Sequence, residues 1–192
     1  MFEKVDDGTW LTGMTRYEGC PLALRVRPSA DSAANRAAFG HLGVVTHQLA
    51  NVRDNGLPEI QYNRSLEDFD VALQFAMKGD GAGLVVLIET FAGKRTYYAY
   101  VDDDDTFRAR VGALSRLFEH HQLTVECRPD AAWRFYERYR KDFPWRRVPA
   151  RAAIPATGEA RRAGGACGNC VTAPYGFVAN ASKPRRLLGS IV

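Results

Sequence analysis

The chain has 192 residues, of which 46% are hydrophobic and 25% are charged, a composition typical of soluble globular proteins. This length suits one ordinary domain with an appendage and is too short for two domains of comfortable size. No run approaches the roughly 20 apolar residues that a membrane helix needs, and the N-terminal residues lack the layout of a secretion signal. We therefore expect a cytoplasmic protein without membrane contacts.

The formal net charge of +4 is unevenly distributed along the chain. Residues 150–192 contain six Lys and Arg side chains against the single acidic side chain of Glu159, which gives +5, so residues 1–149 carry −1. A positive net charge can indicate binding to nucleic acid. Here the basic excess belongs to the C-terminal stretch, and the part expected to fold is close to neutral.

Two strands are predicted first, over Thr9–Tyr17 and Leu22–Arg27, with a short turn between them. Trp10 at the head of the first strand is interpreted as an anchor in the core or at its rim. A short helix is predicted over Asp31–Phe39. Asp31 is its expected N-terminal cap, because Asp side chains accept hydrogen bonds from free helix amides.

A third strand is predicted over Leu42–Leu49, and the clearest helix of the chain follows from Ser65. The segment Ser65–Asp68 resembles a capping box, although Asp stands where Glu is usual. Apolar residues then follow helical spacing as far as Lys78, so one face of this helix should be buried. The residues of that face are Leu66, Phe69, Leu73, Ala76 and Met77.

A β-hairpin is predicted next, with strands over Leu84–Phe91 and Arg95–Val101. Gly93 lies in the turn between them, where a residue without a Cβ atom takes a positive φ at no steric cost. The first five residues of Leu84–Phe91 are all apolar. A strand with one solvent-exposed face would alternate apolar and polar residues, so both faces of this strand should be covered.

The last predicted elements are a helix over Thr106–His120, a strand over Leu123–Cys127 and a third helix from Pro129 to Phe143. From the third strand onward, the order is that of the split βαβ arrangement of ferredoxin-like α+β folds. We predict such an antiparallel sheet, βαββαβ plus a C-terminal helix, with an extra N-terminal hairpin. Because this topology leaves Leu84–Phe91 at an exposed edge, we expect the N-terminal hairpin or a second subunit to cover that edge.

Residues 1–148 are therefore predicted to form one domain, followed by a disordered tail over residues 149–192. The tail is dominated by Ala, Gly, Arg and Pro, and buries too little apolar surface to offset its ordering entropy. Cys167 and Cys170 within it have zinc-knuckle or redox spacing, but a zinc site needs four ligands and no second pair follows. Chance spacing is the favoured interpretation, and Cys20 and Cys127 are interpreted as reduced residues of the core or strands.

Two motifs resemble a known bacterial group: Tyr97–Asp102 before a helix, and Arg128–Tyr136 after a strand. The chain is similar in these motifs to the domain of unknown function family 695, and more distantly to the ribonuclease E inhibitor protein B. Trp10, the turn Asn55–Pro58 and the helix from Ser65 are similar to that family too. The resemblance implies a ferredoxin-like fold. It implies no activity, so no catalytic residue and no cofactor is assigned.

An acidic run, Asp102–Asp105, is the first candidate for chemistry, because hard cations bind clustered carboxylate oxygens. Acidic side chains also suit the start of a helix, where they cap amides and face the positive end of the helix dipole. The second interpretation is favoured, since no other acidic cluster lies at a matching spacing. The four histidines, at positions 41, 47, 120 and 121, lack a carboxylate or thiolate partner at a diagnostic spacing, so no metal site is predicted from them.

Basic and aromatic residues interleave along the third helix and just beyond it. The candidate interaction surface consists of Trp133, Arg134, Tyr136, Arg138, Arg140, Arg146 and Arg147. Such residues can stack on bases and bind phosphate. The rings can equally pack on the sheet while the Arg side chains stay in water, and the helical spacing favours packing.

The sequence therefore predicts a small domain that acts by binding, with a protein or a second copy of the chain as its partner and regulation as its role. RNA binding through residues 133–147 and the basic tail is the alternative. An enzyme with a site near Asp102–Asp105 is the third hypothesis.

Overall fold

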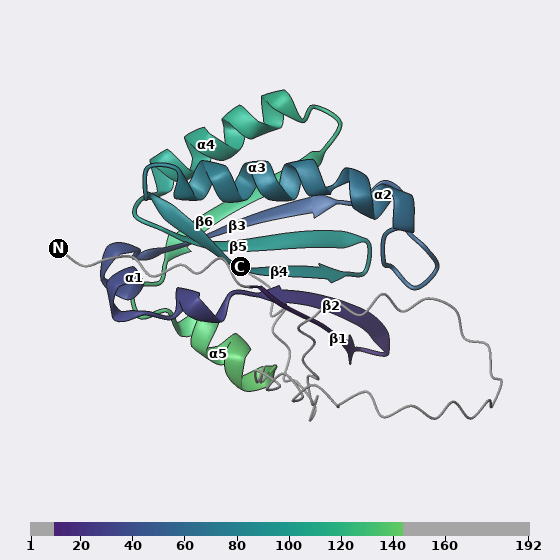
Figure 1. Ribbon diagram of the computed structural model, residues 1–192, viewed down its shortest axis with the longest axis horizontal. Coiled ribbons are helices and arrows are strands. Elements are labelled where there is room, and N and C mark those ends of the chain that lie inside the picture. The colour runs from purple at the N-terminus through teal and green to yellow at the C-terminus, as the bar shows by residue number, and fades with distance from the viewer. Residues whose placement is uncertain (1–9, 144–192) are drawn as a thin grey trace, which may run out of the picture.

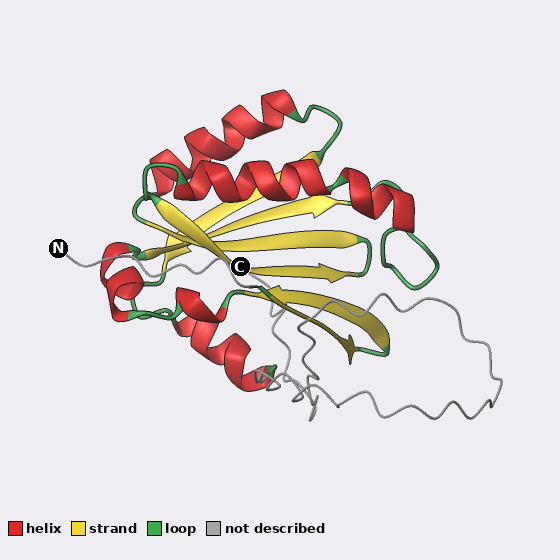
Figure 2. Ribbon diagram, in the orientation of Figure 1, coloured by secondary structure: helices red, strands yellow, loops and turns green. Residues whose placement is uncertain are grey.

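The computed structural model describes residues 10–143 as an antiparallel sheet with helices on both faces (Figure 1, Figure 2). The strands are β1 (Leu11–Tyr17), β2 (Cys20–Val26), β3 (His41–Gln48), β4 (Gly83–Phe91), β5 (Lys94–Val101) and β6 (Gln122–Pro129). The helices are η1 (Pro28–Ala30), α1 (Ala33–Ala38), α2 (Ile60–Ser65), α3 (Glu67–Lys78), α4 (Asp104–Leu117) and α5 (Arg134–Asp142). The predicted combination of helices with an antiparallel sheet is confirmed, and the predicted tail lies outside the described residues.

The six strands lie in the order β1-β2-β4-β5-β3-β6, and every neighbouring pair is antiparallel. Strand β2 pairs with β4, placing Ala23 opposite Thr90 and Val26 opposite Leu87. The apolar strand β4 is therefore an inner strand, and within residues 10–143 the edges are β1 and β6.

Both faces of β4 are covered, as its unbroken apolar run predicts. A register shift between Val85 and Leu87 changes the alternation of its side chains. Val85 and Ile88 pack with buried residues of α3 and α4, whereas Leu84 and Leu87 pack with buried residues of α5. Figure 1 shows α3 and α4 over one face of the sheet and α1 and α5 below the other.

The α3–α4 layer buries the stripe expected from helical spacing, including Phe69 and Leu73, against Phe107 and Val111. Gly43 on β3 makes room for this layer, because a Cβ atom there would lie 2.6 Å from the ring of Phe107. Real Cβ atoms do not approach other carbons so closely, so this position needs glycine for packing rather than for a special φ.

The α5 layer is held by an aromatic stack and a side-chain cap. The ring of Trp133 stacks on Tyr100 with 3.8 Å between centroids, and its indole N–H donates to the Phe39 carbonyl at 2.9 Å. These contacts hold Trp133 at φ 54, a left-handed conformation that bulky residues rarely adopt. Asp130 accepts from the Arg134 amide at 2.8 Å, so it caps the helix although α5 begins four residues later.

Two predicted helix starts are wrong in detail. Ser65 is the last residue of α2, a helix that was not predicted, and its hydroxyl donates to the Tyr62 carbonyl instead of capping α3. The cap of α1 is Ser32, which accepts from the Asn35 amide, while the neighbouring Asp31 carboxylate pairs with Arg36. Both Ser65 and Asp31 could cap a helix, but each binds another nearby group instead: the Tyr62 carbonyl and the Arg36 side chain, respectively.

Replacing Gly43 with Ala should destabilise the domain by about 1–3 kcal/mol, because the added methyl group overpacks the layer against Phe107. Gly112→Ala on α4 is the matched control, since a Cβ atom there meets nothing within 4 Å. That change should stabilise the helix by about 0.5–1 kcal/mol. Urea unfolding measures both. Equal stability of Gly43→Ala and the wild type would contradict the described packing.

Candidate functional site

An open groove lies on the α3 side of the sheet, between the β1–β2 hairpin and helices α2 and α3. Helix α3 packs over β4, and side chains of β1, β2, α2 and α3 line hollows between the hairpin and these helices. The central hollow has a volume of about 400 Å³. Its lining residues are Thr12, Ala23, Leu24, Arg25, Asn63, Arg64, Glu67, Asp70, Val71, Gln74, Ile88, Thr90 and Arg95. We call this surface, with the two hollows that continue it, the hairpin groove.

The two further hollows share lining residues with the central one, Val71 and Gln74 on one side and Asn63 and Arg95 on the other. Large apolar side chains are exposed along the combined groove. They are Met14, Ile60, Val71 and Phe75, four of the six large hydrophobic residues that are exposed in the described part of the chain. Exposed apolar side chains gathered along one concavity mark an interaction surface.

A buried carboxylate, Asp70, forms the floor of the hairpin groove where α3 meets the sheet. Tyr97 donates to it at 2.6 Å, Arg95 donates to both of its oxygens at 3.2 Å, and Arg25 donates at 2.8 Å. The Arg95 guanidinium also donates to Thr90 and to Asn63. Burial, followed by the charge of Asp70, raises the pKa of Tyr97 well above its ordinary value, so its hydroxyl stays protonated and donates.

Trp10 lies at one end of the hairpin groove, half-buried at the rim as the sequence suggested. Its indole N–H donates to the Gln74 side-chain oxygen at 3.2 Å, and that oxygen also accepts from Arg27 at 2.9 Å. The guanidinium of Arg27 lies 4.5 Å from the centroid of the Trp10 ring, and that of Arg25 lies 5.3 Å from it. These contacts connect α3 with the start and the end of the hairpin, because Trp10 precedes β1 and Arg27 follows β2.

The hairpin groove keeps guanidinium N–H groups that Asp70 does not bind. Within residues 10–143, Arg25 uses only Nη1 in a hydrogen bond, and its side chain is 37% exposed. Arg64 on α2 is exposed and lines the same hollow. Guanidinium groups are strong, geometrically specific partners for carboxylates. The groove can therefore bind a carboxylate beside apolar side chains.

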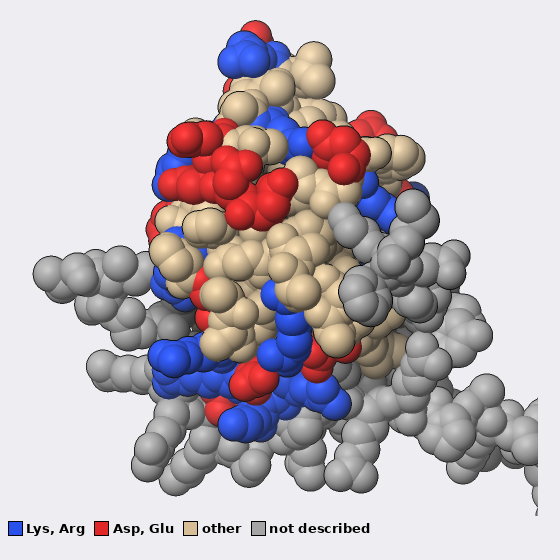
Figure 3. All heavy atoms as spheres, turned by 90° about the vertical axis from the view of Figure 1, so that its left-hand side faces the viewer, with Lys and Arg blue, Asp and Glu red and all other residues tan. Residues whose placement is uncertain are grey.

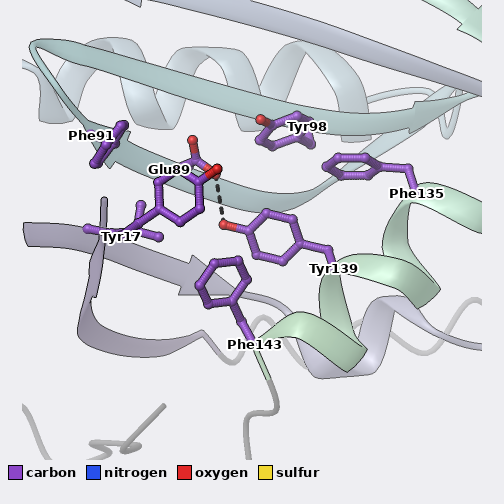
Figure 4. A pocket seen from close by; sticks show the side chains of 8 residues that line it. Tyr17, Glu89, Phe91, Tyr98, Phe135, Tyr139 and Phe143 are labelled. Atoms are coloured by element: carbon purple, nitrogen blue, oxygen red, sulfur yellow. Dashed lines mark hydrogen bonds between the residues drawn. The ribbon is translucent and has the colours of Figure 1, made fainter. Parts of the chain in front are cut away.

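A second, smaller hollow lies on the opposite side of the sheet, between the hairpin and α5 (Figure 4). It has a volume of about 40 Å³ and is lined by Tyr17, Leu22, Glu89, Phe91, Tyr98, Phe135, Tyr139 and Phe143. Tyr139 donates to the Glu89 carboxylate at 2.8 Å. Burial raises the pKa of Glu89, and the hydrogen bond from Tyr139 only partly opposes that effect. We call this hollow the Glu89 pocket.

The interaction surface predicted on α5 divides into two kinds of residue. Trp133 and Tyr136 are buried, so their rings belong to the core and offer no stacking face to a ligand. Arg134, Arg138 and Arg140 are exposed, and Arg140 pairs with Asp31 at 3.0 Å. Arg146 and Arg147 lie outside the described residues. A role of the exposed Arg side chains in binding stays a prediction.

The acidic run Asp102–Asp105 lies at the start of α4. Asp103 is the helix cap and accepts from the Thr106 amide at 2.9 Å. Hydrogen bonding to the Thr106 side chain, followed by this bond to the amide, lowers the pKa of the Asp103 carboxyl. Figure 3 shows acidic side chains gathered on this face of the molecule, with basic side chains below them. In residues 10–143, no three His, Cys, Asp or Glu side chains are placed to hold a metal ion.

His47 and His121 meet on the α3–α4 side of the sheet, with 4.3 Å between their ring centroids. His47 is buried, and its burial, followed by the nearby His121, lowers its pKa to about 4. Burial also lowers the pKa of His121. His41 lies elsewhere, with Nδ1 2.9 Å from the Asp102 carbonyl oxygen. The buried ring of His47 thus packs against the half-buried ring of His121.

The residues that build the hairpin groove were not predicted, although the sequence contains a signal for them. Asp70 occupies a position of the buried helical stripe, together with Leu66 and Leu73. Arg95 lies on the strand face that also buries Tyr97 and Ala99. A charged residue at a buried position of a helix, and one of opposite sign on a buried strand face, could have suggested their pairing.

Comparison with known proteins gives one match. The model of a family of unknown function, DUF695, matches residues 8–139. The chain belongs to this family. The predicted resemblance to domain of unknown function family 695 is thus confirmed, whereas similarity to ribonuclease E inhibitor protein B stays a prediction. No curated protein and no solved structure matches the chain. The DUF695 match includes both strands of the hairpin and helices α2 and α3, so the whole groove lies inside the family domain.

Replacing Asp70 with Asn should destabilise this DUF695 domain by about 3–5 kcal/mol, because it leaves the buried Arg95 guanidinium without a carboxylate. Asp80→Asn is the matched control. Asp80 pairs with Arg110 at the surface, where ion pairs contribute little, so this variant should keep nearly wild-type stability. Urea unfolding of the three proteins makes the comparison. Equal losses of stability in the two variants would contradict a structural role of Asp70.

Acidification should weaken the fold through His47, whose pKa falls from 6.5 to about 4 on folding. The unfolded chain binds a proton as the pH drops below 6.5 and the folded chain does not, so stability is lost between these two pH values. His47→Phe keeps an aromatic ring and removes this titration. Between about pH 7.5 and pH 5, the free energy of unfolding should fall by about 2 kcal/mol more in the wild type. If the free energy of unfolding of the two proteins falls equally with pH, His47 is not the cause of the acid sensitivity.

Proposed function

We propose that this DUF695 domain is a binding module whose hairpin groove takes a segment of a partner protein that carries both acidic and apolar side chains. The observation that carries the proposal is the coincidence of four exposed apolar side chains with partly exposed Arg side chains in one continuous concavity. We propose in addition that the domain regulates the partner that it binds.

Each part of the groove contributes differently to such a complex. Burial of Ile60, Val71 and Phe75 against a partner removes apolar surface from water, which favours binding. Arg25 and Arg64 supply orientation, because a carboxylate between them replaces hydration with charge-assisted hydrogen bonds. The Asp70 network holds Arg25 in place before the partner arrives, which reduces the ordering cost of binding.

The hairpin groove supports a protein partner better than RNA. Binding to single-stranded RNA relies on exposed aromatic rings on which bases stack. The rings predicted for that role, Trp133 and Tyr136, are buried, and the large apolar side chains that are exposed in the groove are aliphatic apart from Phe75. RNA binding through the Arg residues of α5 is the second candidate, and a second copy of the chain is one form that the protein partner can take.

We also infer that β3–β6 with α3 and α4 form a split βαβ unit of the ferredoxin-like type, to which the hairpin is an addition. The strand order supports this inference: β5 separates β3 from β4, and β3 separates β5 from β6.

A cytoplasmic location is proposed as well. Cys20 and Cys127 are free thiols, which suits a reducing compartment, and no described helix is long and apolar enough to cross a membrane.

Affinity capture from a lysate of the source cells with the full chain tests the proposed function. Val71→Glu and Arg64→Glu place negative charge in the hairpin groove and should each reduce recovery of the partner at least tenfold. The matched controls are Leu117→Glu and Arg116→Glu, which change an exposed apolar and an exposed basic residue of α4 outside the groove. These controls should retain the partner.

Two results would contradict the proposal. In the first, the groove variants retain the partner as well as the controls do. In the second, nuclease treatment removes everything that is captured, and Arg134→Glu or Arg138→Glu abolishes the capture. The latter result would favour RNA binding on α5 instead. RNA binding would also weaken steeply as salt is added.

A further inference from the structure

The Glu89 pocket combines a carboxylate with a wall of aromatic rings. Glu89 projects from β4 toward α5, and six of the seven other lining residues are Tyr or Phe (Figure 4). The rings of Tyr98 and Phe135 stack with 4.5 Å between centroids, and Tyr17 meets Phe91 edge-on at 5.4 Å. A Leu or Phe side chain in place of Glu89 would make this an ordinary apolar core.

Two polar atoms of the Glu89 pocket lack a hydrogen-bond partner among residues 10–143. Tyr139 donates to one carboxylate oxygen of Glu89, and no described group donates to the other. The hydroxyl group of Tyr98 also lines the pocket without a hydrogen bond. Desolvation of the half-buried Glu89 carboxyl group disfavours its charged form and raises its pKa. The pocket thus presents a carboxylate oxygen and a hydroxyl oxygen to whatever enters it.

We propose that the Glu89 pocket binds a primary alkylammonium group, supplied by a free alkylamine or by the side chain of a lysine. The ammonium N–H groups would donate to the unpaired oxygen of Glu89 and to the hydroxyl of Tyr98. The surrounding ring faces attract a cation, by about 0.5–2 kcal/mol for each well-placed ring. A bound cation would also favour the ionised form of Glu89.

The size of the pocket agrees with this ligand class. Its volume of about 40 Å³ exceeds the roughly 10–15 Å³ that one water molecule requires, so an ammonium group and its first methylene can enter. The pocket lies on the α5 side of the sheet, away from the hairpin groove, and its ligand is a cation where the groove is proposed to bind a carboxylate. The inference therefore stands independently of the proposed function.

NMR titration of the full chain tests the inference, with the aromatic ring signals of Tyr98 and Phe135 as the readout. At matched ionic strength, butylammonium chloride should shift these signals saturably, whereas its neutral analogue butanol should shift them at least tenfold less at equal concentration. N-acetyl-lysine methylamide distinguishes the two sources. Binding of both amines identifies a lysine side chain as a ligand, and binding of butylammonium alone identifies a free amine.

Three variants complete the experiment. Glu89→Gln keeps an acceptor for Tyr139, removes the charge and should weaken butylammonium binding at least tenfold. Phe135→Leu keeps the carboxylate and removes a ring face, so it should weaken binding even if Glu89→Gln does not fold. Glu119→Gln, at an exposed carboxyl group outside the pocket, should bind as the wild type does. Equal shifts with butanol, or unchanged affinity in both pocket variants, would overturn the inference.

Discussion

The buried carboxylate of Asp70 is the interaction on which the rest of this structure depends. It joins three elements that are distant in sequence, because α3 supplies the carboxylate while β2 and β5 supply Arg25 and Arg95. A buried ion pair is weak evidence for net stability, but it strongly disfavours any arrangement that leaves one partner unpaired. Asp70 thereby sets the position of α3 relative to the hairpin, and so sets the width and the floor of the hairpin groove.

Strand β4 connects the two candidate binding surfaces. Neighbouring residues of a strand point to opposite faces of a sheet, so Thr90 faces the hairpin groove while Glu89 faces the pocket under α5. The hairpin contributes to both surfaces through its two faces, with Arg25 on one and Tyr17 on the other. Pairing of β2 with β4 therefore protects an apolar strand edge and also forms one wall of each surface.

Local and periodic features of this DUF695 domain could be predicted from the sequence, whereas features that depend on tertiary pairing could not. The β4–β5 hairpin, the apolar stripe of α3 and the cap of α4 follow from spacing and turn chemistry. The hairpin groove depends on Asp70 and Arg95, which are 25 residues apart and meet only in the folded chain. The aromatic residues of α5 were correctly favoured as core, because helical periodicity reports burial even where composition suggests RNA binding. Helix α2 was not predicted because its six residues span fewer than two turns, too few for a periodic signal.

Hydrogen–deuterium exchange of the full chain, alone and with its captured partner, tests the central claim most directly. If the hairpin groove is the binding surface, the partner should slow amide exchange in β1 and across α2 and α3, the elements that carry Met14, Ile60 and Val71. Exchange in β6 and α5 should change little. Slowed exchange confined to α5 or β6, with β1 and α2 unaffected, would contradict the account.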